Sequence, residues 1–175
     1  ELPEDVMGET LDAEPLPVDT RGRRLEPAAG DLLAAAEIIR NAISPIILAG
    51  NGVSRAGAAP ALRELVRATG IGVAETFMGK GALDYEDVHA LGTVGLQSRD
   101  YALAGFEDAD VVITVGYDLV EHAPVNWNPN GDKRIVCIDS TPAEVDEHFI
   151  TATDLIGDID LILRRLTALC GTGNP

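Results

Sequence analysis

Short apolar runs typical of strands alternate along the chain with segments in which apolar residues recur at helical spacing. This alternation predicts strands separated by helices. The clearest strand is Val111–Val115, where four apolar residues and Thr114 fit a strand that is buried on both faces. The other predicted strands are shorter or less regular, and they lie at 46–49, 71–74, 90–94, 134–138 and 154–156.

Helical periodicity precedes the first predicted strand and also separates the first strand from the second. A stripe of apolar residues begins after Asp31, and Pro45 must end the helix that carries it. A second helix is predicted at 57–69, with Pro60 tolerated in its first turn and Gly70 placed to end it. The stripe of the first helix consists of Leu32, Ala36, Ile39 and Ile43.

Three further helices are expected in the second half of the chain. The last of them is predicted most clearly, because Asp158 is a suitable N-cap and apolar residues follow at helical spacing. Shorter helices are expected at 100–106 and 142–149. The buried face of the last helix is predicted to contain Ile159, Ile162, Leu163, Leu166 and Leu169.

Strands that alternate with helices predict an α/β fold, because parallel strands need crossover connections that pack helices against the sheet. We expect a three-layer Rossmann-like domain with a mostly parallel sheet of about six strands and helices on both faces. This domain is expected to span residues 27–170. Residues 1–26 carry scattered prolines and charges without a sustained period, which predicts a linker from a preceding domain, and 171–175 begin the following linker.

The composition is that of one domain with a strongly acidic surface. The chain has 175 residues, 46% of them hydrophobic, which suffices for a single core. Its 13 Lys and Arg against 29 Asp and Glu give a formal net charge of -16, which disfavours nucleic acid and anionic membranes as partners. No apolar run reaches the roughly 18 residues of a membrane helix and no signal peptide is evident, so a cytoplasmic location is expected.

The spacing of cysteines and histidines predicts no metal site. Cys137 lies in a predicted strand and Cys170 near a helix end, with no C-x-x-C pair between them. The three histidines stand far apart in the sequence, and none lies beside a nucleophilic serine motif. We interpret the neighbouring carboxylates of Asp118 and Glu121 as solvated charge.

Gly50, Asn51 and Gly52 form a turn between a predicted strand and a helix, where a dinucleotide-binding loop would lie. The fingerprint of such a loop is incomplete, because Arg55 stands where its third glycine is expected. The acidic residue that would bind a ribose is Glu75. Two hypotheses therefore stay open for this turn: a bound dinucleotide, or glycines kept for tight packing.

The run from Gly116 to Asn128, G-Y-D-L-V-E-H-A-P-V-N-W-N, resembles the segment after the fourth strand in the middle domain of catabolic acetolactate synthases. These are thiamine-diphosphate enzymes, and the resemblance extends over nearly the whole chain. The first residues, which include L-P-E-D-V, resemble the end of the preceding catalytic domain in that family. The chain is therefore expected to be an excised middle domain.

Two departures from the flavin-binding members of the family imply a flavin-free domain. Those members show R-F-D-D-R after the glycine that corresponds to Gly116, whereas Tyr117 stands here at the place of the first arginine. They also show I-D-I-D-P after the next strand, whereas this chain has Thr141 in place of the second acid. FAD is therefore not expected, although Asp139 can still accept a hydrogen bond from a ribose hydroxyl.

Two loops resemble segments that face the catalytic domains in the family. Met78 and Lys80 belong to an M-G-K-G loop, and Gln97 follows Gly95 in the loop after the third strand. The resemblance implies that these residues are interface candidates, with Lys80 available to an anionic group. A solvated lysine in a glycine turn is the competing interpretation.

The resemblance implies that the catalytic residues lie outside this chain. Thiamine diphosphate and Mg2+ are held in the family by a G-D-G element and a later asparagine, and the chain has no such element. The parent enzyme would convert two pyruvates to 2-acetolactate and CO2 as a homo-oligomer, with this domain as an inactive spacer between the missing N- and C-terminal domains. Its crevice would be vestigial, with the candidate residues Gly50, Asn51, Gly52, Gly116, Tyr117 and Asp139.

Two other functions remain as alternatives. One is an FAD-binding central domain of an anabolic acetohydroxyacid synthase or a related carboligase, in which Arg55 or Arg99 would contact the flavin. The other is an NAD-dependent deacylase, because the segment from Gly50 to Ser54 loosely resembles the G-A-G-x-S motif of sirtuins. The second is disfavoured, because the chain has two cysteines and the zinc site of sirtuins usually needs four.

Overall fold

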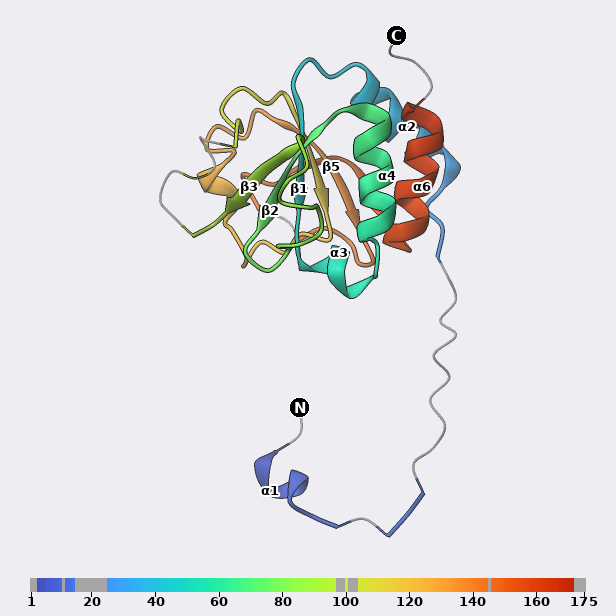
Figure 1. Cartoon of the computed structure of the whole chain (residues 1–175), viewed down its shortest axis with the longest axis vertical. Coiled ribbons are helices and arrows are strands. Elements are labelled where there is room, and N and C mark those ends of the chain that lie inside the picture. The colour runs from blue at the N-terminus through green and yellow to red at the C-terminus, as the bar shows by residue number, and fades with distance from the viewer. Residues whose placement is uncertain are drawn as a thin grey trace.

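Six parallel strands form a single sheet in the order β3-β2-β1-β4-β5-β6 (Figure 1). The structure, a computed structural model, describes residues 3–10, 12–14, 25–96, 100, 104–144 and 146–171. The α/β class, the parallel sheet and all six predicted strands are confirmed. The strands are β1 Pro45–Ala49, β2 Gly72–Thr76, β3 Ala90–Val94, β4 Val111–Val115, β5 Arg134–Asp139 and β6 Thr151–Ile156.

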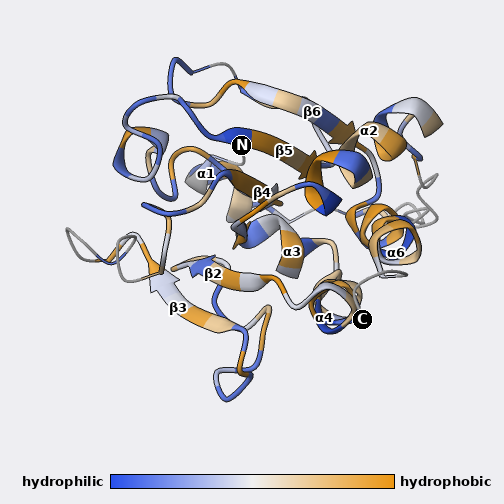
Figure 2. Cartoon of the chain, turned by 90° about the horizontal axis from the view of Figure 1, so that it is seen from above, coloured by the Kyte–Doolittle hydropathy of each residue, from blue (hydrophilic) through white to orange (hydrophobic). Residues whose placement is uncertain are grey.

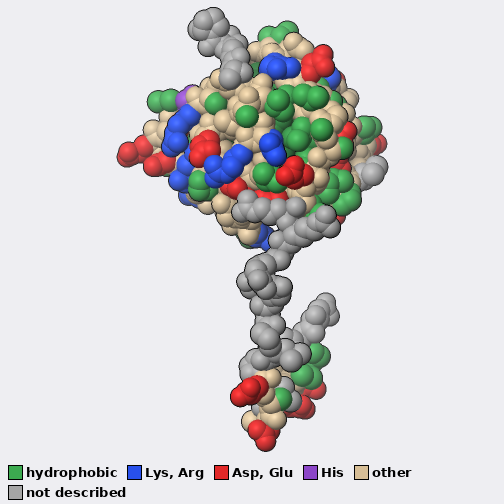
Figure 3. All heavy atoms as spheres, turned by 90° about the vertical axis from the view of Figure 1, so that its right-hand side faces the viewer, with side chains coloured by type: hydrophobic (Ala, Val, Ile, Leu, Met, Phe, Trp, Pro, Cys, Tyr) green, Lys and Arg blue, Asp and Glu red, His purple; other side chains and the backbone are tan. Residues whose placement is uncertain are grey.

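Three long helices cover one face of the sheet, as Figures 1 and 2 show. They are α2 Ala29–Arg40, α4 Ala59–Thr69 and α6 Ile159–Cys170. Arg164 on α6 pairs with Glu64 on α4 at 2.8 Å and with Asp160 at 3.1 Å. The outer side of this layer, seen in Figure 3, carries basic and acidic side chains among apolar ones, as expected for the solvent-facing side of amphipathic helices.

The strands divide their side chains between two hydrophobic clusters, because successive residues of a strand point to opposite faces. In β1, Ile47 and Ala49 join the cluster under the helices, whereas Ile46 and Leu48 join the cluster on the other face. The second cluster contains four aromatic side chains, which are Phe106, Tyr117, Trp127 and Phe149. Both faces of the sheet are therefore buried, which explains the continuous apolar runs in the sequence.

Irregular backbone covers the second face of the sheet. In the part of the chain that the structure describes, its regular elements are limited to the 3-10 helix η1, Pro124–Asn126, and a helical position at Asp100. The predicted helix at 100–106 lies partly outside the described residues, and 104–108 form turns. The third layer of the domain is thus built mainly from loops.

The helix predicted at 142–149 is wrong for the residues that the structure describes there. Asp146 and Phe149 form an isolated antiparallel bridge instead of a helical turn. The Asp146 side chain accepts a hydrogen bond from the His148 N–H at 2.8 Å, and Asp154 accepts one from the Ala143 N–H at 3.0 Å. These bonds give backbone groups partners that a helix would otherwise supply.

The prediction that Ile43 belongs to the apolar stripe of the first helix is also wrong. Helix α2 ends at Arg40, and the Ile43 side chain is 93% exposed. The carboxylate of Asp110 accepts the N–H groups of Ile43 and Ser44, both at 2.8 Å, and thereby holds the turn that leads into β1. Hydrogen bonds to a residue far along the chain therefore fix the path of the segment that follows the helix.

The predicted ends of the other two long helices are confirmed. Gly70 adopts φ 72° and ends α4, and Pro60 lies in the first turn of that helix. The Asp158 side chain accepts the Leu161 N–H at 3.0 Å and caps α6. Of the five residues predicted for the buried face of α6, Leu169 is half-buried and the others are buried.

The structure also contains two short helices that the sequence does not predict. Helix α3, Asn51–Arg55, is too short to show a period. A four-residue helix α1, Glu4–Met7, lies within the predicted linker.

The packing of α6 gives a first testable prediction. Leu163 is fully buried in the cluster under the helices, so Leu163→Ala should lower the free energy of unfolding by about 3 kcal/mol. Leu33→Ala is the matched control, because Leu33 is 57% exposed on α2 and its loss should cost less than about 1 kcal/mol. Urea unfolding of both variants checks the difference, and equal losses would contradict the assigned core.

Candidate functional site

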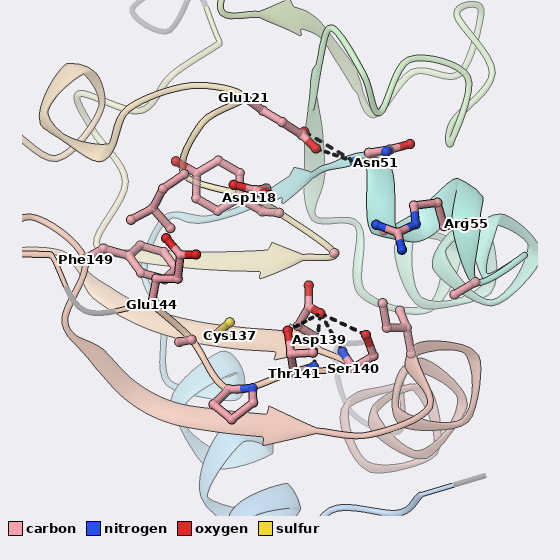
Figure 4. A pocket seen from close by; sticks show the side chains of 18 residues that line it. Asn51, Arg55, Asp118, Glu121, Cys137, Asp139, Ser140, Thr141, Glu144 and Phe149 are labelled. Atoms are coloured by element: carbon pink, nitrogen blue, oxygen red, sulfur yellow. Dashed lines mark hydrogen bonds between the residues drawn. The ribbon is translucent and has the colours of Figure 1, made fainter. Parts of the chain in front are cut away.

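A crevice opens at the carboxyl end of the sheet between β1 and β4. These strands are neighbours, but the chain leads from β1 toward β2 and from β4 toward β5, so the two connections diverge. Ligands of open α/β sheets bind at such a switch point. The cavity there has a volume of about 430 Å³ and is lined by the segments that follow β1, β4 and β5 (Figure 4).

Two glycine turns cross at the floor of this crevice. The Gly52 N–H donates to the Gly116 carbonyl at 2.8 Å, and the Gly50 N–H donates to Val115 at 2.9 Å. A Cβ on Gly52 would lie 2.5 Å from the Gly116 Cα, and a Cβ on Gly50 would collide with the Gly116 carbonyl. The contact explains why these positions are glycine, and it occupies a backbone N–H that a nucleotide-binding turn would present to phosphate.

Glu121 lies in this crevice and is bonded to the turn after β1. Its carboxylate oxygens accept the Asn51 N–H at 3.2 and 3.3 Å, and one of them also accepts the Thr76 hydroxyl. The Thr76 oxygen in turn accepts the Gly79 N–H at 3.0 Å. Glu121 is only 8% exposed, so its interpretation as solvated charge is wrong. The sequence signal for a buried acceptor is Thr76, because a hydroxyl at the end of a buried strand needs a hydrogen-bond partner.

Tyr117 turns its ring into the aromatic cluster on the second face of the sheet. Its hydroxyl donates to the His122 carbonyl and accepts the Trp127 Nε1–H at 3.4 Å. Its ring lies 5.6 Å from that of Phe149 and 6.1 Å from that of Trp127, between centroids. Burial raises the pKa of the Tyr117 hydroxyl far above its usual range, so the group remains neutral. Tyr117 therefore anchors the loop after β4 as a packing residue.

Asp139 ends β5 and organises the turn that follows it. One of its oxygens accepts the Ser140 N–H at 2.6 Å and the Thr141 N–H at 3.2 Å. Arg55 on α3 extends toward the same space from the opposite side (Figure 4). The residues that line the crevice include four carboxylates against this one guanidinium, the four being Asp118, Glu121, Asp139 and Glu144. Such a charge balance disfavours a diphosphate.

The crevice contains no activated nucleophile. Cys137 lies at its wall, but its side chain is 4% exposed and burial raises the pKa of its thiol to about 12. The thiolate is the reactive form of cysteine, so this thiol is inert near neutral pH. Among the described residues, no group of three or more His, Cys, Asp or Glu side chains is placed to hold a metal ion.

The remaining candidate residues lie away from the crevice or beyond the described part of the chain. Met78 and Lys80 are in the loop after β2, where the Met78 side chain is 50% exposed. Gln97 lies outside the described residues. Glu75 accepts the N–H groups of Gly81 at 3.2 Å and Leu83 at 2.8 Å. This carboxylate therefore closes its own loop and does not face the crevice as a ribose ligand would.

No helix in the described part of the chain has the length and apolar character needed to cross a membrane. Five of the six predicted crevice residues line the cavity, and the sixth, Gly50, lies against Gly116. The two described interface candidates lie on a separate loop.

Residues 32–166 match the family model described as "Thiamine pyrophosphate enzyme, central domain". Since this match covers most of the chain, the chain belongs to the family of central domains of thiamine pyrophosphate enzymes. The family confirms the resemblance found in the sequence, and it separates the chain from the deacylase alternative.

Several relatives of this chain are acetolactate synthases. The acetolactate synthase of Bacillus subtilis (strain 168) is 35% identical over 168 residues, which cover 94% of this chain and 29% of the relative. A probable acetolactate synthase large subunit of Methanococcus aeolicus is 31% identical over 175 residues, which cover 95% of this chain and 29% of the relative. The chain therefore spans less than a third of the length of these relatives.

A solved structure supports the fold. A protein from Mycobacterium smegmatis, described as a thiamin diphosphate-dependent enzyme, superposes with a TM-score of 0.73 at 24% sequence identity. The superposition covers 93% of this chain and 32% of that protein.

The crossing of the glycine turns gives a second prediction. Gly116→Ala should cost at least about 2 kcal/mol more of unfolding free energy than Gly57→Ala, because its Cβ would lie 2.5 Å from the Gly52 Cα. Gly57 is the matched control, since its φ of +63° resembles the +55° of Gly116 but nothing lies within 4 Å of an added Cβ. Guanidinium unfolding separates the two costs, and similar losses would contradict the close contact.

Proposed function

We propose that the chain is the non-catalytic central domain of a flavin-free acetolactate synthase. The parent enzyme would decarboxylate one pyruvate and join the remaining two-carbon unit to a second pyruvate, giving 2-acetolactate and CO2. The likeness to acetolactate synthases over 94% of the chain supports the reaction. The buried carboxylate of Glu121, bonded to the turn after β1, is the observation that supports a domain without flavin.

The residues of this chain do not fit a thiamine diphosphate site. The family implies this cofactor for the parent enzyme, and when bound it supplies an electron sink for decarboxylation. A diphosphate of this kind is anchored through a divalent cation, yet the described residues offer no cluster of metal ligands. The acidic lining of the crevice also opposes the diphosphate itself. We infer that the cofactor and Mg2+ are bound by the parts of the enzyme outside this chain.

The crevice is equally unsuited to FAD. Tyr117, at the position that carries an arginine in the flavin-binding resemblance, packs among aromatic rings with 7% exposure. Thr141 contributes a hydroxyl and a backbone N–H near Asp139, where the resemblance has a second acid. The residues at both strand ends that correspond to flavin contacts therefore make contacts within this chain instead. We infer a scaffold that retains the shape of a nucleotide domain without its ligand.

The role that remains is mechanical support of the catalytic domains. The loop after β2 exposes Phe77 by 42% and Met78 by 50%, with Lys80 beside them. Exposed apolar side chains next to a cation suit a contact surface. We propose that this loop, together with Gln97, faces the N- and C-terminal catalytic domains of a cytoplasmic homo-oligomer. Residues 1–26 and 171–175 would be the linkers to those domains, and 27–170 the central domain itself.

The absence of catalytic residues is tested by assaying the 175-residue chain for acetolactate. With pyruvate, thiamine diphosphate and Mg2+ supplied, the chain should form no 2-acetolactate above the rate without protein, because the described residues offer no cluster of metal ligands to anchor the cofactor. A full-length acetolactate synthase assayed in parallel is the positive control. Turnover by the chain that exceeds the protein-free rate would contradict the proposal.

Flavin binding is tested separately by calorimetric titration of the chain with FAD. We expect no measurable heat of binding, because the crevice is acidic and Glu121 already accepts the Asn51 N–H. A flavin-binding acetohydroxyacid synthase serves as the control that the titration detects the interaction. A saturable isotherm with a micromolar Kd would favour the alternative of an FAD-binding central domain.

A further inference from the structure

Glu121 joins the ends of three strands that are neighbours in the sheet, although β4 lies far from the other two along the chain. It follows β4 in the chain, yet its carboxylate accepts the Asn51 N–H directly after β1 and the Thr76 hydroxyl at the end of β2. Residue 121 lies 70 positions from Asn51 and 45 from Thr76. At 8% exposure the carboxylate is shielded from solvent, so these contacts are made by a buried charge.

The location of this charge coincides with the place where doubly wound domains hold phosphate. In such domains the turn after the first strand presents backbone N–H groups to the phosphates of a nucleotide at the switch point. Here the Asn51 N–H, the central donor of that turn, points at the Glu121 carboxylate (Figure 4). The neighbouring Gly52 N–H is bonded to Gly116. The polypeptide thus supplies its own anion to the turn.

A second anion at this turn would meet an unfavourable field. Like charges repel strongly where solvent is excluded, and Glu121 is buried. The one cation in the lining, Arg55, is exposed at the rim and does not neutralise the carboxylate by an ion pair at the turn. A nucleoside diphosphate would therefore have to displace Glu121 and leave the Thr76 hydroxyl without this partner.

We propose that Glu121 is the residue that determines the ligand specificity of the crevice: it excludes nucleoside diphosphates and braces the ends of β1 and β2 in their place. The inference rests on the proposed flavin-free function, and it assigns that property to one side chain. The chain has Tyr117 and Thr141 where the flavin-binding relatives have an arginine and an acid, so it lacks two groups that attract a nucleotide. The Glu121 carboxylate, in contrast, actively repels a phosphate at the turn.

The test compares the unaltered chain with Glu121→Ala, Glu121→Gln and Glu144→Ala, each titrated with ADP as the probe. Glu144→Ala is the matched control, because it removes one carboxylate from the same crevice at an exposed position. Glu121→Ala should bind ADP at least about tenfold more tightly than the unaltered chain. Glu121→Gln removes the charge but keeps an oxygen for the Asn51 N–H, so it should gain less than the alanine variant.

Thermal unfolding gives a second measurement on the same proteins. Glu121→Ala should lower the Tm by roughly 5 °C, because Asn51 and Thr76 lose a shared acceptor. Millimolar ADP should recover part of that loss in Glu121→Ala and leave the Tm of the unaltered chain and of Glu144→Ala unchanged. If Glu121→Ala does not fold, the same comparison is made with Glu121→Gln, which should show the gain in ADP affinity at a smaller size.

The outcomes separate this inference from the proposed function. FAD uptake by the unaltered chain would contradict the flavin-free function itself, whereas uptake of ADP alone would contradict the exclusion assigned to Glu121. An unaltered chain that binds neither ligand, together with Glu121 variants that also fail to bind ADP, would contradict the role of Glu121 alone. An equal gain in Glu144→Ala would overturn the inference as well, because general acidity of the crevice would then explain the exclusion.

Discussion

The close contact between the turns after β1 and β4 is the constraint on which the rest of the site depends. The Gly52 N–H reaches the Gly116 carbonyl at 2.8 Å, and no side chain fits between the two backbones. Gly116 has a φ of +55°, which glycine adopts readily. This contact fixes where the two connections diverge, and it brings Glu121 within reach of the turn after β1. The crevice and its internal carboxylate are consequences of that crossing.

The elements that the sequence predicts correctly are those whose signal is local. A strand buried on both faces needs mostly apolar residues, and Val111–Val115, which has one polar residue among five, is found with the predicted bounds. The end of α4 follows from one glycine, and the start of α6 follows from one aspartate. The errors fall where distant residues decide the backbone. Asp110 ends the segment after α2, and Asp154 holds Ala143 out of a helix, and neither partner is recognisable from neighbouring sequence.

The crevice shows the same division between local and distant signals. The turn glycines are predicted from their places at strand ends and Asp139 from the resemblance, and Gly52, Gly116 and Asp139 all line the crevice. The direction of Tyr117 could not be predicted, because it depends on Trp127 and Phe149 arriving at the same face. Glu121 was missed for the reason that its partners lie 70 and 45 residues away. Resemblance identified the segment, whereas only geometry revealed the burial of its charge.

The two faces of the sheet are covered differently, so stability and ligand binding depend on different layers of the domain. Long helices on the first face share an extensive core, so substitutions there are coupled to the stability of the whole. The layer of loops on the second face includes the segments after β4 and β5 that line the crevice. Loops accept changes in length and sequence more readily than packed helices. Selection can therefore rebuild the ligand side of such a domain, or abolish its ligand, while the helical side preserves the fold throughout.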